Sequence, residues 1–392
     1  MNVSSTDVAP ELGRSLRLLR IGAFTSQFDR LMIAPMIVVI AGELHGSVDS
    51  VSRAAAVYFL GYGLAQIVWA MVSDRLGRVR TMRIAFACAA VGGLASAFVP
   101  SVGLLVLARG ITGACVAAAI PGGLVYVGDT VPMRVRQAPL TDLMTSSAMG
   151  MTMATVCAGI IAEFTSWRVA FALTAVACGV LAVAMRGMTE PTLAPPAPVF
   201  ASLRAVLFNR PALLVLVLVF VEGLVLLGPL TFVPVVLHAT GLSVTLSGVL
   251  TAAYGLAVLV FARVVKGRSR TVAPAVLILV GGVLAVVAYA VMTIDHGAVA
   301  VVAGLVLLGA GWAFMHSTMQ AWITDVAPNS RATAVSLFAT LLFCGSALGA
   351  AVFGPMVDAG RFQLVFVITL VVAVPLAVVA TIGRGRYATK DS

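Results

Sequence analysis

The chain has 392 residues, of which 61% are hydrophobic and only 10% are charged, with a net charge of +10 at neutral pH. A soluble globular protein carries about 25% charged residues, so this composition excludes a water-soluble fold and indicates a protein embedded in a lipid bilayer. The positive balance does not indicate nucleic-acid binding, because the basic residues lie in short loops between apolar runs.

Twelve apolar runs follow one another, each suited to a membrane-spanning helix of about 20 residues. They lie at about 19–42, 51–73, 81–100, 103–127, 138–162 and 168–187, and at about 211–237, 244–264, 272–292, 298–321, 332–356 and 362–383. Between the two sets, Pro191, Pro195, Pro196 and Pro198 mark a linker, because proline at this density breaks helices. We expect an all-α membrane protein with two six-helix bundles, residues 1–187 and 211–392, joined by the cytoplasmic linker 188–210.

The lysines and arginines predict the orientation of the chain. With the N-terminus inside, 20 of the 25 lie on the inner side, 3 on the outer side (Arg53, Arg168 and Arg361) and 2 within helices (Arg30 and Arg109). By the positive-inside rule both termini lie in the cytoplasm. The polar N-terminus has no signal-peptide pattern, so the first helix is expected to act as the insertion signal. We expect a multi-pass protein of a bacterial cytoplasmic (inner) membrane.

An internal repeat relates the two halves. The residues Gly113, Asp129 and Pro132 recur 196 positions later as Gly309, Asp325 and Pro328. Two halves in the same orientation are related by a pseudo-two-fold axis along the membrane normal. Such halves leave a cavity between them near the midplane, where transporters bind substrate.

The loop after the second helix reads AMVSDRLGRVRTM. Asp74 ends the helix, and Gly77 suits the tight reversal that follows. The segment resembles the signature Gly-x-x-x-Asp-Arg-x-Gly-Arg of the major facilitator superfamily: Asp74, Arg75, Gly77 and Arg78 match, and Ala70 replaces the first glycine. The resemblance covers nearly the whole chain and implies the major facilitator fold, with 12 transmembrane helices in two pseudo-symmetric bundles.

In that family this loop belongs to a charge network that latches the two halves on the cytoplasmic side. By resemblance, Asp74 would face the eleventh helix and Arg75 or Arg78 would pair with Asp129, with Arg136 following in the same loop. The second half's matching loop has no acid, so the latch is expected mainly in the first half. The alternative is a positive-inside loop with no role in gating.

The fourth helix carries Arg109 in an apolar run, where an arginine costs roughly 2.5–3.5 kcal/mol unless it faces the protein interior and is paired. With Gly113 it resembles the family's Arg-x-x-x-Gly signature, which is associated with proton-coupled transport. The alternative is an arginine close enough to the outer surface to snorkel.

The first helix contains Asp29 and Arg30, which as neighbours point about 100° apart and do not simply neutralise each other. Asp29 shares a mixed polar and apolar face with Thr25, Met32 and Met36. We expect this face to line the cavity between the halves, with Asp29 bridged to Arg109 or Arg30.

The seventh helix adds one more acid within an apolar run, Glu222. Burial in a medium of low dielectric raises the pKa of a carboxyl group, and a nearby arginine lowers it again, so moving a substrate between them couples substrate to proton. We expect Asp29 as the primary protonation site, Glu222 as the secondary one, and Arg109 as their modulator. The alternative is a set of structural ion pairs that hold helices together.

The tenth helix places Trp312, His316 and Gln320 on one stripe. His316 is interpreted either as a packing histidine or as a substrate contact, and ligand spacing for a metal is absent. Six methionines are expected at the cavity, where flexible side chains suit a wall that can repack: Met32, Met36, Met144, Met149, Met151 and Met153. No cofactor attachment site is found.

The pattern Trp167–Arg168–Phe171 after the fifth helix matches the drug-efflux branch of the superfamily, although the fifth helix lacks that branch's Gly-Pro signature. The sequence predicts a monomeric secondary transporter, not an enzyme, that exports small amphipathic compounds in exchange for protons by alternating access. The alternative is proton-coupled export or uptake of one metabolite, such as a sugar, an amino acid or an organic anion bound by Arg30 and Arg109. The expected partners are a small-molecule substrate, protons and the lipid bilayer, with no nucleic acid.

Overall fold

The computed structural model describes residues 10–192, 199–269 and 271–388. Some residues used in the sequence arguments lie outside this part of the chain, namely Pro195, Pro196, Pro198, Arg270 and Lys390. The described residues form helices and connecting turns, without a strand. Eleven of the helical stretches are long and apolar enough to cross a membrane, and the bent pair α1 and α2 makes a twelfth. The prediction of an all-α membrane protein with twelve spans is confirmed.

The first six spans are α1 and α2 together, α3, α4, α5 and α6 together, α7 and α8. Their bounds are α1 Pro10–Leu31, α2 Ile33–Glu43, α3 Val48–Leu76, α4 Arg78–Phe98, α5 Val102–Val116, α6 Ala119–Thr130, α7 Gln137–Phe164 and α8 Trp167–Ala184. The first span begins nine residues before the apolar run that predicted it, because its first turns carry Arg14 and Arg17. Hydropathy does not detect such a polar helical extension.

The remaining spans are built from α10, α11 and α12 together, then α13, α14, α15, α16 and α17. Their bounds are α10 Arg210–Glu222, α11 Gly228–Leu230, α12 Val233–Ala239, α13 Val244–Arg268, α14 Pro274–Ile294, α15 Ala298–Val326, α16 Arg331–Asp358 and α17 Phe362–Ala388. The region expected as a linker is not wholly irregular, because Val199–Leu207 forms a short helix, α9.

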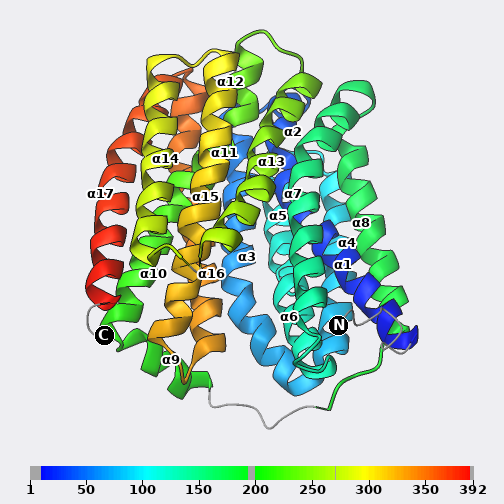
Figure 1. Ribbon diagram of the computed structural model, residues 1–392. Coiled ribbons are helices and arrows are strands. Elements are labelled where there is room, and N and C mark those ends of the chain that lie inside the picture. Colours follow the sequence, from blue (N-terminus) through cyan, green and yellow to red (C-terminus); the bar gives the residue numbers. More distant parts are fainter. Residues whose placement is uncertain (1–9, 193–198, 270, 389–392) are drawn as a thin grey trace.

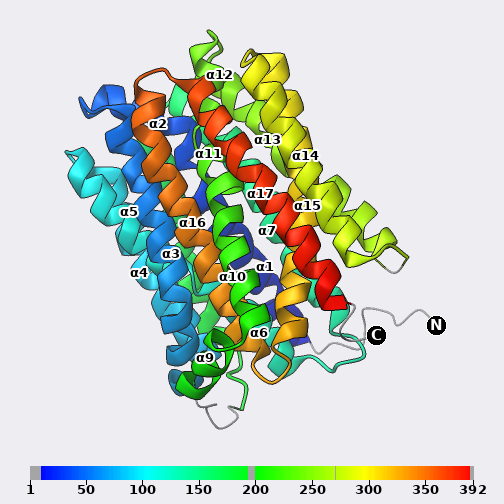
Figure 2. The same ribbon diagram turned by 90° about the vertical axis from the view of Figure 1, so that its left-hand side faces the viewer.

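The first and last spans begin and end on the same side of the molecule. Figures 1 and 2 show the start of α1 and the end of α17 at one end, here called the near end, together with α9. The opposite end, here called the far end, holds the connections after α2, α7 and α12. Serines cap four of the helices that start there: Ser47, Ser101, Ser166 and Ser243 each accept a hydrogen bond from a backbone N–H of the first turn.

Proline explains the three broken spans. The axes of α1 and α2 differ by 45° at the turn before Pro35, because proline lacks an N–H and its ring clashes with the carbonyl four residues earlier. Pro121 follows the break between α5 and α6 in the same way. In the seventh span, Pro229 follows a π-helical turn, Gly223–Leu227, and the Val225 carbonyl that it releases accepts a hydrogen bond from the Tyr289 hydroxyl.

Two helix pairs make the main contact between the halves, α3 with α16 and α7 with α13. Glycine allows close approach in the second pair, since a Cβ on Gly248 would lie 2.3 Å from the Thr155 carbonyl oxygen. Within the second half, a Cβ on Gly223 or on Gly345 would lie 1.9 Å from a backbone oxygen of the partner helix. Small residues of this kind let helix backbones pack closely in a membrane, and here they fix α10 against α16 beside Glu222.

Candidate functional site

The first charged pair lies inside the first half. The Arg109 guanidinium donates to both carboxylate oxygens of Asp29, at 3.1 and 3.0 Å, and to the Asp29 backbone oxygen at 2.9 Å. The hydroxyls of Tyr58 and Thr174 donate to the same carboxylate at 2.8 and 3.1 Å. Arg109 and Asp29 are 0% and 1% exposed. The sequence predicted Asp29 bridged to one of two arginines, and the structure selects Arg109.

This pair faces helices of its own half. Arg109 lies between the rings of Tyr58 and Phe171, with centroids at 4.5 and 4.8 Å, so α3, α5 and α8 enclose it. The expectation that the Asp29 face lines the cavity between the halves therefore differs from the observed conformation. Thr25, Met32 and Met36 are also buried, and Met32 and Met36 belong to the hydrophobic core.

Arg30 points instead to the interface between the halves. Its guanidinium carbon lies 5.1 Å from the centre of the Phe343 ring on α16, and Nη2 lies 3.7 Å from the Met151 sulfur on α7. Tyr62 and Tyr254 lie close enough to interact with it electrostatically. Among the described residues no acid forms an ion pair with Arg30, and its Nε–H has no hydrogen-bond partner. It is a buried positive charge without an acidic partner.

The second half holds one buried acid beside a histidine. The Oε2 atom of Glu222 lies 3.0 Å from Nδ1 of His316, while its other oxygen, Oε1, has no hydrogen-bond partner in the described structure. Glu222 is fully buried. The His316 ring stacks on Trp312 at 3.9 Å. Trp312 and His316 were expected on one stripe of the tenth helix, and Glu222 was named apart from them. The structure brings Glu222 to this stripe where α10 passes into the π-helical turn. Gln320 of the same stripe is exposed.

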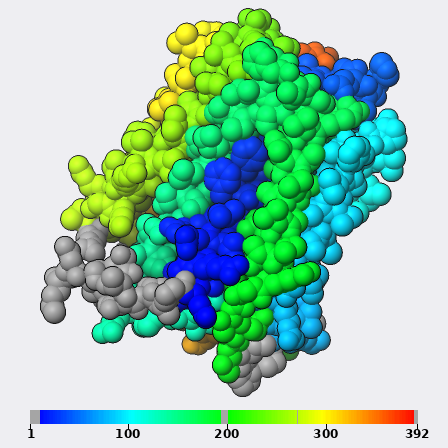
Figure 3. All heavy atoms as spheres, turned by 90° about the vertical axis from the view of Figure 1, so that its right-hand side faces the viewer, coloured from blue at the N-terminus to red at the C-terminus, as the bar shows by residue number. Residues whose placement is uncertain are grey.

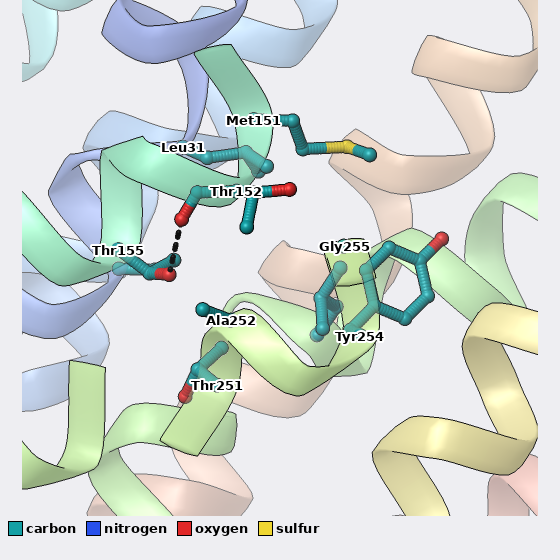
Figure 4. Close-up of a pocket in the computed structure, with 10 residues that line it drawn as sticks. Leu31, Met151, Thr152, Thr155, Thr251, Ala252, Tyr254 and Gly255 are labelled. Atoms are coloured by element: carbon teal, nitrogen blue, oxygen red, sulfur yellow. Dashed lines mark hydrogen bonds between the residues drawn. The ribbon is translucent and has the colours of Figure 1, made fainter. Parts of the chain in front are cut away.

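A small pocket lies between the halves and is drawn in Figure 4. Met151, Thr152 and Thr155 of α7 line one side, and the segment 251–255 of α13, including Tyr254, lines the other. Leu31, Ala34 and Leu230 complete the wall. Its volume is about 10 Å³, barely enough for one water molecule. The halves are thus nearly closed on each other here, and Met151 is the only one of the six named methionines that lines this pocket.

Hydrogen bonds fasten the two halves at the far end. The Val48 N–H donates to Asp358 Oδ1 at 2.8 Å, and the Thr245 N–H donates to Glu163 Oε2 at 2.6 Å. Deeper in the interface, the Thr340 hydroxyl donates to the Gly63 carbonyl at 2.9 Å. The sequence analysis missed these acids. Each receives a helix N-terminal amide of the opposite half, and only the tertiary fold reveals that pairing.

The predicted pairing of Arg78 with Asp129 is present at the near end, but it does not join the two halves. Arg78 forms ion pairs with Asp74 and, at 3.1 Å, with Asp129, and Gly77 has the positive φ of 104° that favours glycine. These partners all belong to the first half, so in this conformation the network ties α3, α4 and α6 together. Arg75 is exposed, and Arg136 donates to the Val131 carbonyl at 3.0 Å instead of joining the network.

One residue of the linker also holds this loop, and the sequence analysis missed it. The Glu190 carboxylate accepts the backbone N–H groups of Val79 and Arg80, at 2.9 and 3.1 Å. At the start of α4 these amides have no acceptor within the helix, so Glu190 satisfies them, and the helix dipole also favours a carboxylate there. The sequence shows Glu190 as an acid just after the first bundle. It does not show that this acid binds the N–H of Arg80, which lies 110 residues earlier in the chain.

The comparisons with known proteins agree with this architecture. The family model described as the Major Facilitator Superfamily matches residues 19–350. The chain belongs to this superfamily of transporters. The "Uncharacterized MFS-type transporter YybF" of Bacillus subtilis is 23% identical over 324 residues, which cover 81% of this chain and 80% of that one. The "Probable efflux pump mfs2" of Aspergillus flavus is 28% identical over 145 residues, 37% of this chain and 34% of that one.

Among solved structures, a D-xylose-proton symporter is similar in fold, with a TM-score of 0.78 and 16% sequence identity over 93% of this chain and 97% of that one. This identity shows a common fold alone. As a member of the superfamily whose model matches residues 19–350, the chain is a membrane-embedded transporter of small molecules. It is not an enzyme.

Proposed function

We propose that this superfamily member is a secondary active exporter that exchanges protons for small amphipathic compounds by alternating access. The observation that carries the proposal is the buried pair of Glu222 and His316, with one Glu222 oxygen free of any partner in the described structure. A buried carboxyl group that shares a hydrogen bond with an imidazole can hold a proton, because protonation removes a charge that burial disfavours.

The π-helical turn beside Glu222 supports this role, since such turns are often found at functional sites. In the exchange, a compound entering from the near end would displace the proton held at the Glu222–His316 pair. After the halves rock, a proton from the far side would return to the pair as the compound leaves. We assign Asp29 and Arg109 a different part in the same cycle: their pair would keep α1 and α5 together while the halves move.

The proposal includes an orientation and a division of the chain. The near end, which carries most of the arginines, would face the cytoplasm of a bacterial cell, and the bundles 1–187 and 211–392 would move against each other about the segment 188–210. The far-end bonds from Asp358 and Glu163 then close the outer side. Labelling of a cysteine placed in the 359–361 turn by an impermeant maleimide on intact cells tests this orientation. Labelling only after lysis would contradict it.

The coupling is tested in proteoliposomes with an imposed pH gradient, using ethidium as the transported compound. We expect gradient-driven ethidium transport by the wild-type chain and loss of gradient dependence in Glu222→Gln. Asp295→Asn is the matched control, since Asp295 caps a far-end turn within the second half. Gradient dependence at the wild-type level in Glu222→Gln would refute proton coupling through this residue.

A second candidate function is transport of one organic anion, and Arg30 favours it. An unpaired guanidinium at the interface between the halves is suited to a carboxylate, which it can bind through two parallel hydrogen bonds. Two assays discriminate between the candidates. Resistance of an expressing, pump-deficient bacterium to several unrelated cationic compounds supports the exporter. An Arg30→Gln variant that loses transport of an aromatic carboxylate, while Arg30→Lys retains part of it, supports the anion transporter.

A further inference from the structure

A groove runs along the outer face of the first half, away from the interface between the halves. It lies between α4 and α8 and has a volume of about 520 Å³. Figure 3 shows the surfaces of these two helices, light blue and green, next to each other on one lateral side of the molecule. The exposed side chains of Ile84 and Val183 line the groove, so we expect it to face lipid and not the transport pathway.

Small side chains create the groove. Its lining includes Ala87, Ala90 and Gly179. A Cβ added to Gly93 would lie 2.9 Å from the Ala175 side chain, whereas a Cβ on Gly179, one turn toward the near end, would lie 3.8 Å from Ala90. The helices α4 and α8 therefore touch at Gly93 and Ala175 and leave a furrow on the near-end side of this contact. The exposed side chains of Ile84 and Val183 form apolar walls.

Arginines surround the near end of the furrow. Arg80, Arg83 and Arg186 line it, and none of the three forms an ion pair in the described part of the chain. Arg83 donates to the Ala182 carbonyl at 3.3 Å. The nearby acid, Glu190, already accepts two backbone N–H groups with its two oxygens. The mouth of the furrow therefore has a surplus of positive charge.

We propose that this groove, with Arg80, Arg83 and Arg186 at the near end of the apolar furrow between α4 and α8, binds one anionic phospholipid. The phosphate of the headgroup lies among the three guanidinium groups, and one acyl chain fills the furrow. Basic pockets between membrane helices bind anionic headgroups in this way, and guanidinium groups match phosphate oxygens geometrically. The furrow requires a chain because an unfilled apolar space loses contacts on both walls.

The position of the site gives the lipid a structural effect. A short 3-10 helical turn, Met185–Gly187, joins the end of α8 to the linker, and Glu190 of that linker caps the start of α4. A lipid bridging α4 and α8 would hold these three segments together at the near end. We expect bound lipid to stabilise the first half without depending on the transported compound, and the inference stands independently of proton coupling.

The test is native mass spectrometry of the purified chain with equimolar dioleoyl-phosphatidylglycerol and dioleoyl-phosphatidylcholine. We expect the wild-type chain to retain one phosphatidylglycerol in preference to phosphatidylcholine by about tenfold or more. The triple variant Arg80→Gln, Arg83→Gln and Arg186→Gln is expected to lose this preference. The matched control removes three charges from the near end of α13 in the second half, with Arg263→Gln, Lys266→Gln and Arg268→Gln, and is expected to keep it.

A second variant separates shape from charge. Gly179→Leu fills the furrow and leaves all three arginines in place, so we expect phosphatidylglycerol retention to fall although the charge is unchanged. The thermal midpoint of each folded variant, with and without added phosphatidylglycerol, reports whether lipid stabilisation is lost with binding. Equal retention of both lipids by the wild-type chain, or an equal loss in the α13 control, would overturn the proposal in favour of attraction to the leaflet as a whole.

Discussion

Asp29 and Arg30 are neighbours in α1 but belong to different environments. Asp29 is neutralised by Arg109 inside the first half, with both carboxylate oxygens occupied. Arg30 turns to the interface between the halves, against Phe343 and Met151. A step of one residue along the helix thus separates a structural ion pair from a charge that has no acidic partner among the described residues. The difference assigns the two residues different roles in our account.

The first prediction concerns the buried ion pair. Asp29→Asn or Arg109→Gln leaves a buried charge without its partner, which costs about 3–5 kcal/mol. We expect either single variant to lower the thermal midpoint of the purified chain strongly. The double variant is expected to recover part of the loss, because no uncompensated charge remains. Arg53→Gln, at an exposed far-end pair, is the control. Additive losses in the double variant would contradict this interpretation.

The second prediction concerns the contact between α10 and α16. In Gly345→Ala the added Cβ would lie only 1.9 Å from the Phe220 carbonyl oxygen. One of the two helices must therefore shift. Overpacking costs typically about 1–3 kcal/mol, and we expect lower thermal stability together with a weakened Glu222 site beside the contact. Gly103→Ala meets nothing within 4 Å and is expected to have no such effect. Equal behaviour of the two variants in a thermal-shift assay would show that the contact is looser than described.

The third prediction concerns the far end. Removing the acids that join the halves, with Glu163→Ala and Asp358→Ala, takes away the acceptors for the Thr245 and Val48 amides. We expect the far end to open more often. Spin labels at Phe164→Cys and Ala239→Cys, in a chain without its native cysteines, measure this as a shift to longer distances. Asp295→Ala, which removes a cap within the second half, should leave the distances unchanged. Unchanged distances in the double variant would show that these bonds do not hold the halves together.

Much of the fold could be predicted from hydropathy and arginine placement, because a bilayer requires an apolar run for each span. The breaks within spans and the helix in the linker were not predicted. The bend at Pro35 and the π-helical turn before Pro229 depend on which carbonyls find new partners, as the Val225 carbonyl does with Tyr289. The helix α9 follows a proline-rich stretch that indicated only a linker.

The candidate site was predicted in part. An ionisable residue in an apolar run is a local signal, so Asp29, Arg109 and Glu222 were found. Their surroundings were not, because they depend on side chains from distant helices. Sequence spacing gave no sign that His316 meets Glu222, 94 residues away. For the same reason the residues expected to form the latch pair with one another within the first half. The observed bonds between the halves involve Glu163 and Asp358, which were not singled out from the sequence.

The central claim is that the Glu222–His316 pair exchanges a proton for the transported compound. The most direct measurement is proton release when ethidium is added to the purified chain in a weakly buffered detergent solution, followed with a pH indicator. We predict release of about one proton per bound ethidium by the wild-type chain, because one carboxyl group holds the exchanged proton, and none by Glu222→Gln that still binds ethidium. Release at the wild-type level by Glu222→Gln would contradict the account.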